Sequence, residues 1–350
     1  MKNIKLLTLI LLTSIFSFTS CQDEIDIENG DRTNTNNASS PTASNLERTS
    51  MYDGSFDDFL DGISCSSILL PVTATINNTE ITILNESQYN LVLDILGSII
   101  NDEDSIEFQF PISVMLSNYT EVQIANQTEY DALIDACTLA EQNNEDPISC
   151  LDINFPITIL TYSLNLEQTG RVIIDNEQQL YTYINNLSND DLFSINYPIT
   201  ATLNNDTNVE ITNDTDLSTQ INECLGVEAN INDAKEDAKT LEGILVEGLF
   251  KIESFTTSGT DTANLYANYT IDFANDLTCT AENSVNPLSE DVQGTYTIAS
   301  ELDVFLSLTF SENAMFQLLN HKWEVTSYSD SSIALQSTTN TAIALVLSQI

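Results

Sequence analysis

The clearest regularity in this chain is an alternation of apolar and polar positions around four prolines between residues 65 and 225. Each proline follows a large apolar residue and precedes a β-branched one, and a second, shorter alternation comes next. Because successive side chains of a strand point to opposite faces, each stretch predicts two strands joined as a hairpin. The prolines are Pro71, Pro111, Pro156 and Pro198, and the second strands are marked by Ile81 and Ile83, Val122 and Ile124, Val172 and Ile174, and Val209 and Ile211.

The alternation is longest around Pro111, where every second residue from Ile106 to Leu116 is apolar. This predicts one strand that runs through the proline, with Pro111 on the opposite face. Since proline cannot donate a ladder hydrogen bond, we expect this strand at a sheet edge or a bulge.

Each predicted hairpin is followed by an asparagine with an acidic or amide residue three positions later. This spacing resembles a capping box and predicts four helix starts. Apolar residues or cysteine four, eight and eleven positions after the asparagine then predict a helical stripe facing the sheet. The asparagines are Asn85, Asn126, Asn176 and Asn213, their partners are Gln88, Glu129, Gln179 and Asp216, and the stripes are Tyr89, Leu93 and Leu96; Tyr130, Ile134 and Cys137; Leu180, Ile184 and Leu187; and Leu217, Ile221 and Cys224.

The sequence therefore predicts four tandem strand–strand–helix (ββα) repeats over residues 51–225. A unit of about 40 residues is too small to bury its own core, so we expect neighbouring units to pack together. The pattern resembles the proline-centred tandem repeats of Bacteroidota lipoproteins, and this resemblance implies no activity. Repeat arrays often serve as binding surfaces or spacers.

The cysteines share a longer period. Cys65 and Cys150 lie six residues before a repeat proline, and Cys137 and Cys224 lie twenty-six residues after one. In an exported protein the default interpretation is disulfides, and the pseudo-symmetric pairing is Cys65 with Cys137 and Cys150 with Cys224. The competing pairing joins Cys137 to Cys150 and Cys65 to Cys224. Cys279 remains as a buried free thiol, and the absence of a Cys/His cluster in the sequence predicts no metal site.

From Gly243 the pattern changes to eight short alternating stretches separated by polar turns, after a helical linker over residues 226–242. Eight consecutive strands predict an up-and-down β-barrel or a sandwich over residues 243–350, so the fold class is α+β. The segments Gly248–Ile252, Gly294–Tyr296 and Lys322–Val325 resemble those of lipocalin-like domains in bacterial lipoproteins. Small barrels of this kind either hold one apolar ligand or are filled by side chains, so Trp323 is a candidate ligand-binding residue, with a place in the packed core as the alternative. The strands are expected at 245–255, 266–273, 277–282, 294–298, 304–310, 322–328, 333–336 and 343–347.

The N-terminal residues have the pattern of an export signal. A short basic segment precedes the apolar run Ile4–Phe18, and Phe18-Thr19-Ser20-Cys21 resembles a lipoprotein cleavage box. This predicts a signal peptide over residues 1–20, lipidation at Cys21 and a flexible tether over residues 21–50. Acidic residues directly after Cys21 resemble the surface-export signal of Bacteroidota, which implies an outer-membrane lipoprotein exposed on the cell surface, with outer-membrane lipid as the partner of its acyl anchor.

The net charge of the chain limits the classes of molecule that it can bind. The chain has 53 acidic and 9 basic residues, for a net charge of −44. Such a potential repels phosphate backbones, so we exclude nucleic acid. Acidic, Asn-rich turns are expected at 101–104, 143–146, 189–191 and 230–233. They are interpreted as solvated loops, with Ca²⁺ sites as the alternative, because no EF-hand pattern is present.

Two main functions follow from these patterns. The first is a non-enzymatic surface binding module that holds a small apolar ligand in the barrel. The alternative is a structural or adhesive envelope protein whose repeats contact glycans or other proteins. A glycan hydrolase that uses paired carboxylates is the third hypothesis. His321, the single histidine, has no nucleophile arrangement in the sequence, so we predict no enzyme, no catalytic residue and no cofactor. A cavity in the barrel favours the first function, and an exposed aromatic platform on the repeats favours the second.

Overall fold

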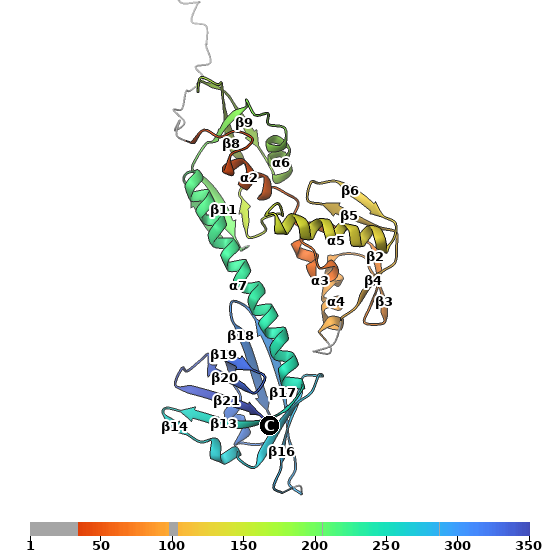
Figure 1. Cartoon of the computed structure of the whole chain (residues 1–350), viewed down its shortest axis with the longest axis vertical. Coiled ribbons are helices and arrows are strands. Elements are labelled where there is room, and N and C mark those ends of the chain that lie inside the picture. Colours follow the sequence, from red (N-terminus) through yellow and green to blue (C-terminus); the bar gives the residue numbers. More distant parts are fainter. Residues whose placement is uncertain (1–33, 98–103, 205, 287) are drawn as a thin grey trace, which may run out of the picture.

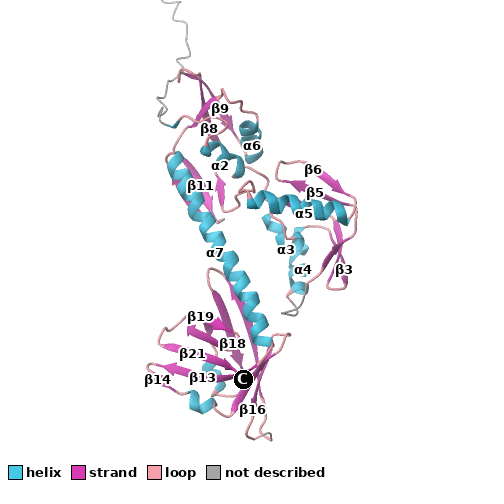
Figure 2. Ribbon diagram, in the orientation of Figure 1, coloured by secondary structure: helices cyan, strands magenta, loops and turns pink. Residues whose placement is uncertain are grey.

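The computed structural model describes residues 34–97, 104–204, 206–286 and 288–350, so Cys21 and the signal segment lie outside the described residues. The fold is α+β. Short sheets and helices form the N-terminal part, a β-barrel forms the C-terminal part, and the helix α7 (Asp214–Val246) runs from one to the other (Figures 1 and 2). None of the described helices combines the length and the apolar character needed to cross a bilayer.

Four three-stranded antiparallel sheets build the N-terminal part, and they form two interlocked pairs. In the first interlocked pair, the strand before Pro71 joins the hairpin after Pro111, and the strand before Pro111 joins the hairpin after Pro71. The sheet orders are β1-β5-β6 and β3-β2-β4. The strands are β1 (Ser66–Ile68), β2 (Val72–Ile76), β3 (Thr79–Ile83), β4 (Ile106–Phe108), β5 (Ile112–Leu116) and β6 (Glu121–Ile124).

The second interlocked pair repeats this exchange around Pro156 and Pro198, with sheet orders β12-β11-β7 and β10-β8-β9. Each sheet thus takes strands from two of the predicted units. The units are not separate strand–strand–helix modules, because a short hairpin leaves an edge that the neighbouring segment pairs with. The strands are β7 (Leu151–Ile153), β8 (Ile157–Tyr162), β9 (Gln168–Ile174), β10 (Leu192–Ile195), β11 (Ile199–Leu203) and β12 (Thr207–Ile211).

At each of the four prolines the chain leaves one sheet and enters its partner. All four X–Pro peptide bonds are cis. The prediction of one continuous strand through Pro111 is wrong, because β4 and β5 belong to different sheets. Reciprocal backbone hydrogen bonds join the two crossings of each pair. The residue two positions before one proline donates its N–H to the residue two positions after the other: Leu69 to Ser113 (2.8 Å), Gln109 to Thr73 (2.8 Å), Asn154 to Thr200 (2.9 Å) and Asn196 to Thr158 (2.9 Å).

Each hairpin leads into a helix, and the four predicted asparagines are the N-caps. Each asparagine side chain accepts a hydrogen bond from a backbone N–H of the first helical turn. In return, the side chain three positions later accepts a hydrogen bond from the backbone N–H of the residue before the asparagine. In the first predicted stripe, Tyr89 and Leu96 pack against the core as expected, but Leu93 is 45% exposed, and Val92 is buried instead. A 3₁₀ turn begins this helix, and its three residues per turn shift the buried face. The helices are η4 (Glu86–Gln88), α4 (Tyr89–Leu96), α5 (Gln127–Gln142), α6 (Glu177–Asn185) and α7.

Part of the predicted tether is folded. Residues 41–48 form α2 (Pro41–Arg48), whose first turn is capped by the Ser40 side chain. Ala43 and Leu46 are buried in the core of the second interlocked pair, and this burial holds the segment in place. Two further short helices, η3 (Ser55–Asp57) and α3 (Asp58–Asp61), precede β1.

The long helix α7 belongs to two cores. Its first half packs into the second interlocked pair through Leu217 and Ile221, and its second half packs on the barrel through Leu241 and Leu245. Residues 226–242 are therefore not a separate short linker but continue the fourth helix. Residues 230–233, expected as an acidic turn, lie within α7, since the helical hydrogen bonding continues through them.

Eight antiparallel strands form the C-terminal barrel, which is closed by pairing between β13 and β21. A two-residue strand, β14 (Thr260–Asp261), extends the edge of β13. The barrel strands are β13 (Leu249–Thr257), β15 (Tyr269–Phe273), β16 (Thr278–Asn283), β17 (Val292–Ser300), β18 (Val304–Phe310), β19 (Lys322–Ser329), β20 (Ser332–Ser337) and β21 (Ile343–Gln349), and the 3₁₀ helices η5 (Ala263–Tyr266) and η6 (Phe316–Leu319) lie in its loops.

Candidate functional site

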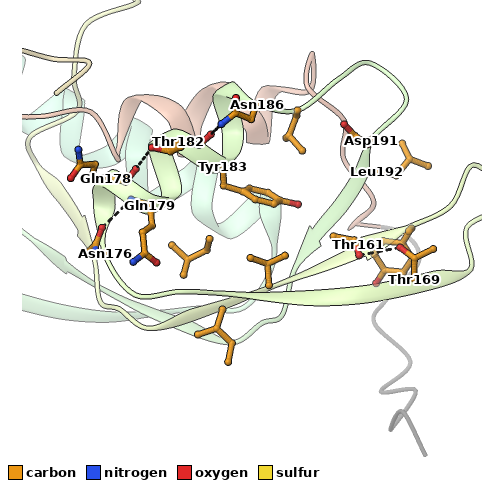
Figure 3. Close-up of a pocket in the computed structure, with 15 residues that line it drawn as sticks. Thr161, Thr169, Asn176, Gln178, Gln179, Thr182, Tyr183, Asn186, Asp191 and Leu192 are labelled. Atoms are coloured by element: carbon orange, nitrogen blue, oxygen red, sulfur yellow. Dashed lines mark hydrogen bonds between the residues drawn. The ribbon is translucent and has the colours of Figure 1, made fainter. Parts of the chain in front are cut away.

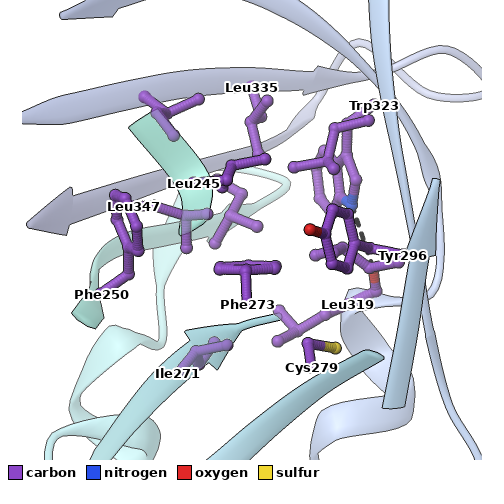
Figure 4. Packing of buried hydrophobic residues seen from close by; sticks show 14 of the residues in the cluster. Leu245, Phe250, Ile271, Phe273, Cys279, Tyr296, Leu319, Trp323, Leu335 and Leu347 are labelled. Atoms are coloured by element: carbon purple, nitrogen blue, oxygen red, sulfur yellow. Dashed lines mark hydrogen bonds between the residues drawn. The ribbon is translucent and has the colours of Figure 1, made fainter. Parts of the chain in front are cut away.

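Aromatic and aliphatic side chains fill the interior of the barrel (Figure 4). Phe273 lies at the centre of this packing and makes edge-to-face contacts with Phe250, at 5.7 Å between ring centroids, and with Tyr296, at 5.1 Å. Such geometries add stabilisation to the burial itself. The fully buried large side chains of the barrel include Phe250, Tyr266, Phe273, Tyr296, Phe310, Phe316 and Trp323.

Trp323, the residue expected to bind a ligand, lies within this packing. Its indole is fully buried, and Nε1 donates a hydrogen bond of 3.0 Å to the carbonyl oxygen of Leu319. The ring also packs edge-to-face against His321, whose Nδ1 lies 3.1 Å from the Ser337 hydroxyl. The indole therefore has no exposed surface for a ligand, and His321 is part of the wall of the barrel.

The cysteines are paired as Cys65–Cys137 and Cys150–Cys224, with Cα–Cα distances of 5.6 and 5.7 Å. This is the pairing that the pseudo-symmetry of the sequence favoured. Each disulfide lies within one interlocked pair and joins its start to its last helix. Among the described cysteines, Cys279 is the one without a disulfide, and burial raises the pKa of its thiol to about 12. Such a thiol stays protonated and unreactive.

An open groove of about 780 Å³ lies between α6 and the β8–β9 hairpin in the second interlocked pair. Figure 3 shows Tyr183 extending from α6 into the space above the strands, with Asn186 and Thr182 beside it on the helix. The floor of the groove is aliphatic, and Asp191 and Leu192 close one end. The walls of the groove carry amides and hydroxyls, which come from Thr161, Thr169, Asn176, Gln178, Gln179, Thr182 and Asn186.

The third hairpin is the longest of the four. β8 and β9 have six and seven residues, whereas the corresponding hairpin strands elsewhere have four or five. The helix is not unusual, since α6 has nine residues, against eight in α4 and sixteen in α5. The longer strands add Thr161, Thr169 and neighbouring residues to the lining of the groove.

Two groups give the groove its chemical character. Burial and the neighbouring Asp191 raise the pKa of Tyr183 to about 12, so its hydroxyl keeps its proton at neutral pH. Asp191 accepts hydrogen bonds from the Ser188 hydroxyl and N–H, both at 2.7 Å, and these bonds lower the pKa of its carboxyl. The groove thus offers a free phenol donor and an ionised carboxylate among neutral amides and hydroxyls.

The predicted acidic turns provide no metal centre in the part of the chain that the structure describes. No group of three or more His, Cys, Asp or Glu residues there is placed to hold one ion. Asp146 instead pairs with Arg48 at 3.1 Å, and Asp104 accepts from the Asn77 amide at 2.7 Å. Residues 101–103 lie outside the described residues.

Sequence reasoning missed the groove. Tyr183 lies seven positions after its N-cap, outside the predicted stripe, yet it packs against the core and against Phe193, so its residue type and spacing gave no signal of a groove. No family model matches this chain, and searches of curated proteins and of solved structures find no match. The function is therefore inferred from the residues of the chain itself.

Proposed function

We propose that this chain is a non-enzymatic, surface-anchored lipoprotein that binds a neutral carbohydrate chain in the groove between α6 and the β8–β9 hairpin. This function corresponds to the adhesive alternative given above, and it replaces the binding of a small apolar ligand in the barrel. One observation carries it: the barrel interior is packed with aromatic side chains, while the open, polar-walled groove belongs to the N-terminal sheets.

The chemistry of the groove supports a sugar ligand. Sugars present hydroxyl groups around apolar C–H faces, and the groove combines amides and hydroxyls with an aliphatic floor and the rings of Tyr162 and Tyr183. Its volume lies in the range of ligand sites. The lining contains one carboxylate and no basic side chain, so a neutral chain fits better than an anionic one.

The anchor is part of the same proposal. Lipidation of Cys21 and the acidic residues after it would hold the protein on the outer membrane, facing outward. The lipocalin-like barrel would then serve as a rigid base, with α7 as the connection to the binding region. Replacement of Cys21 with Ser should release the protein from membranes, and protease treatment of intact cells should digest the wild type. A wild-type protein that resists protease until the cells are opened would contradict surface exposure.

Binding can be tested with an array of neutral hexose and pentose oligosaccharides, followed by calorimetry with those that bind. Tyr183→Phe removes only the phenol hydroxyl. We expect affinity to fall about threefold to tenfold, which corresponds to the loss of one hydrogen bond of about 1 kcal/mol.

Tyr181→Phe is the matched control, because Tyr181 lies on the same helix, outside the groove, and packs against Tyr119. Equal effects of the two variants, or binding that survives Tyr183→Ala unchanged, would contradict the groove as the site. Binding of unfolded peptides instead of sugars would replace the carbohydrate proposal.

A further inference from the structure

A buried carboxyl pair lies where three elements of the first interlocked pair meet. Asp57 ends η3 and is fully buried, and its Oδ2 accepts the N–H of Ile68 in β1 at 2.8 Å. Asp61 ends α3, and its carbonyl oxygen accepts the Tyr130 hydroxyl of α5 at 3.2 Å. The segment between them therefore connects β1 to α5.

Unpartnered oxygens concentrate in this region. Among the described residues, the buried side-chain oxygens and nitrogens that lack a hydrogen-bond partner all belong to residues 57–89. Leaving such atoms unpaired costs free energy, most of all for an ionised carboxylate. The concentration indicates that a proton or a cation is needed there to neutralise the carboxyls. The atoms are Asp57 Oδ1, Asp58 Oδ1, Asp61 Oδ2, Ser66 Oγ and Tyr89 Oη.

The surroundings favour a proton over a cation. No three carboxylates of the described chain are placed around one ion. The groups that face the cluster are mostly acidic or phenolic, and the single cation among them, Lys235 of α7, faces Asp58. These groups are Asp53, Asp58 and Tyr52 of the same segment, Glu86 and Tyr89 next to it, Tyr130, Asp131 and Glu141 of α5, and Lys235.

We propose that Asp57 and Asp61 bind protons at neutral pH, and that these two carboxyls form a pH-sensitive latch holding residues 53–68 against α5. Each protonated carboxyl is neutral and can donate one hydrogen bond. Loss of these protons adds two charges to a site with unpaired oxygens, and the segment loosens. The Cys65–Cys137 disulfide keeps it attached.

The direction of the pH effect follows from burial. Burial, followed by the neighbouring carboxylates, raises the pKa of Asp57 to about 7 and that of Asp61 to about 8. Between about pH 4 and pH 8 the folded latch binds more protons than the unfolded chain, so its stability falls as the pH rises. The stabilisation is fully present below the unfolded-state pKa, falls progressively as the pH rises, and is gone above about pH 8.

Hydrogen exchange of the full mature chain tests this locally. After correction for the intrinsic exchange rate, we expect protection in peptides covering residues 54–68 to fall up to about tenfold per pH unit for each carboxyl between pH 5 and pH 7, and to level off above about pH 8. Asp57→Asn keeps an acceptor for the Ile68 N–H and supplies a permanent donor, so the pH dependence of protection should weaken to that of the remaining Asp61 carboxyl. Asp61→Asn is the second variant, for use if the first fails to fold.

Asp135→Asn, at an exposed position of α5, is the matched control and should titrate like the wild type. A wild-type profile without pH dependence in this segment, or a dependence unchanged in both Asn variants, overturns the proposal. Protection restored at pH 8.5 by millimolar Ca²⁺ in the wild type alone would also overturn it, in favour of a cation site.

Discussion

Removal of the Cys65–Cys137 disulfide should destabilise the first interlocked pair strongly and leave the barrel unchanged. The bond joins residues 72 apart in the sequence. In the chain-entropy model, closing a loop of this length lowers the conformational entropy of the unfolded chain, which raises the free energy of unfolding by about 4.4 kcal/mol. Small domains have total stabilities of about 5–15 kcal/mol, so this is a large share of the stability of that part.

The test is the Cys65→Ala/Cys137→Ala variant in guanidinium chloride. With an assumed slope of about 4 kcal/mol per molar, the midpoint of the N-terminal transition, followed by circular dichroism, should fall by about 1 M. Trp323 is the single tryptophan of the chain and lies in the barrel, so its fluorescence reports a separate transition that should not move. A midpoint that moves by less than about 0.2 M, or an equal shift in both signals, would refute this reasoning.

Two further predictions test the packed barrel. Trp323→Ala should destabilise the barrel by about 3–5 kcal/mol, measured by differential scanning calorimetry, because it empties a fully buried site; a change under about 1 kcal/mol would indicate a loose interior. Gly294→Ala should cost about 1–3 kcal/mol in the same assay, since a Cβ there would lie 2.6 and 2.8 Å from two ring carbons of Phe310. Unchanged stability of this variant would mean that the Phe310 ring can move aside.

Local signals in the sequence predicted the elements well. Each capping asparagine could be predicted because its signal, a partner side chain three positions later, is local. Alternation located the eight strands of the barrel, and these strands pair with their neighbours in sequence, so their pairing needs no long-range information. The same regular order left a barrel and a sandwich both open, and the pairing of β13 with β21 is what closes the barrel.

Long-range pairing could not be predicted in this way. The three-residue strands β1, β4 and β7 are too short to show which hairpin each one joins, so the exchange between the predicted units was invisible. The continuity of α7 was missed because its acidic segment looks like a turn when its packing on two cores is unknown.

The two candidate sites were hidden for different reasons. The groove depends on how α6 and the β8–β9 hairpin are placed in space, which the residue types alone do not give. The latch depends on the burial of Asp57 and Asp61, whereas 53 acidic residues in the sequence suggest solvent-exposed carboxylates.

The most direct test of carbohydrate binding in the N-terminal part is a crystal structure of the mature chain soaked with a neutral oligosaccharide that binds in solution. We expect sugar density along α6, in contact with Tyr183 and Asn186, and a barrel interior that remains filled by Phe273 and Trp323. Density inside the barrel beside a displaced Trp323, with an empty groove, would contradict the proposed function.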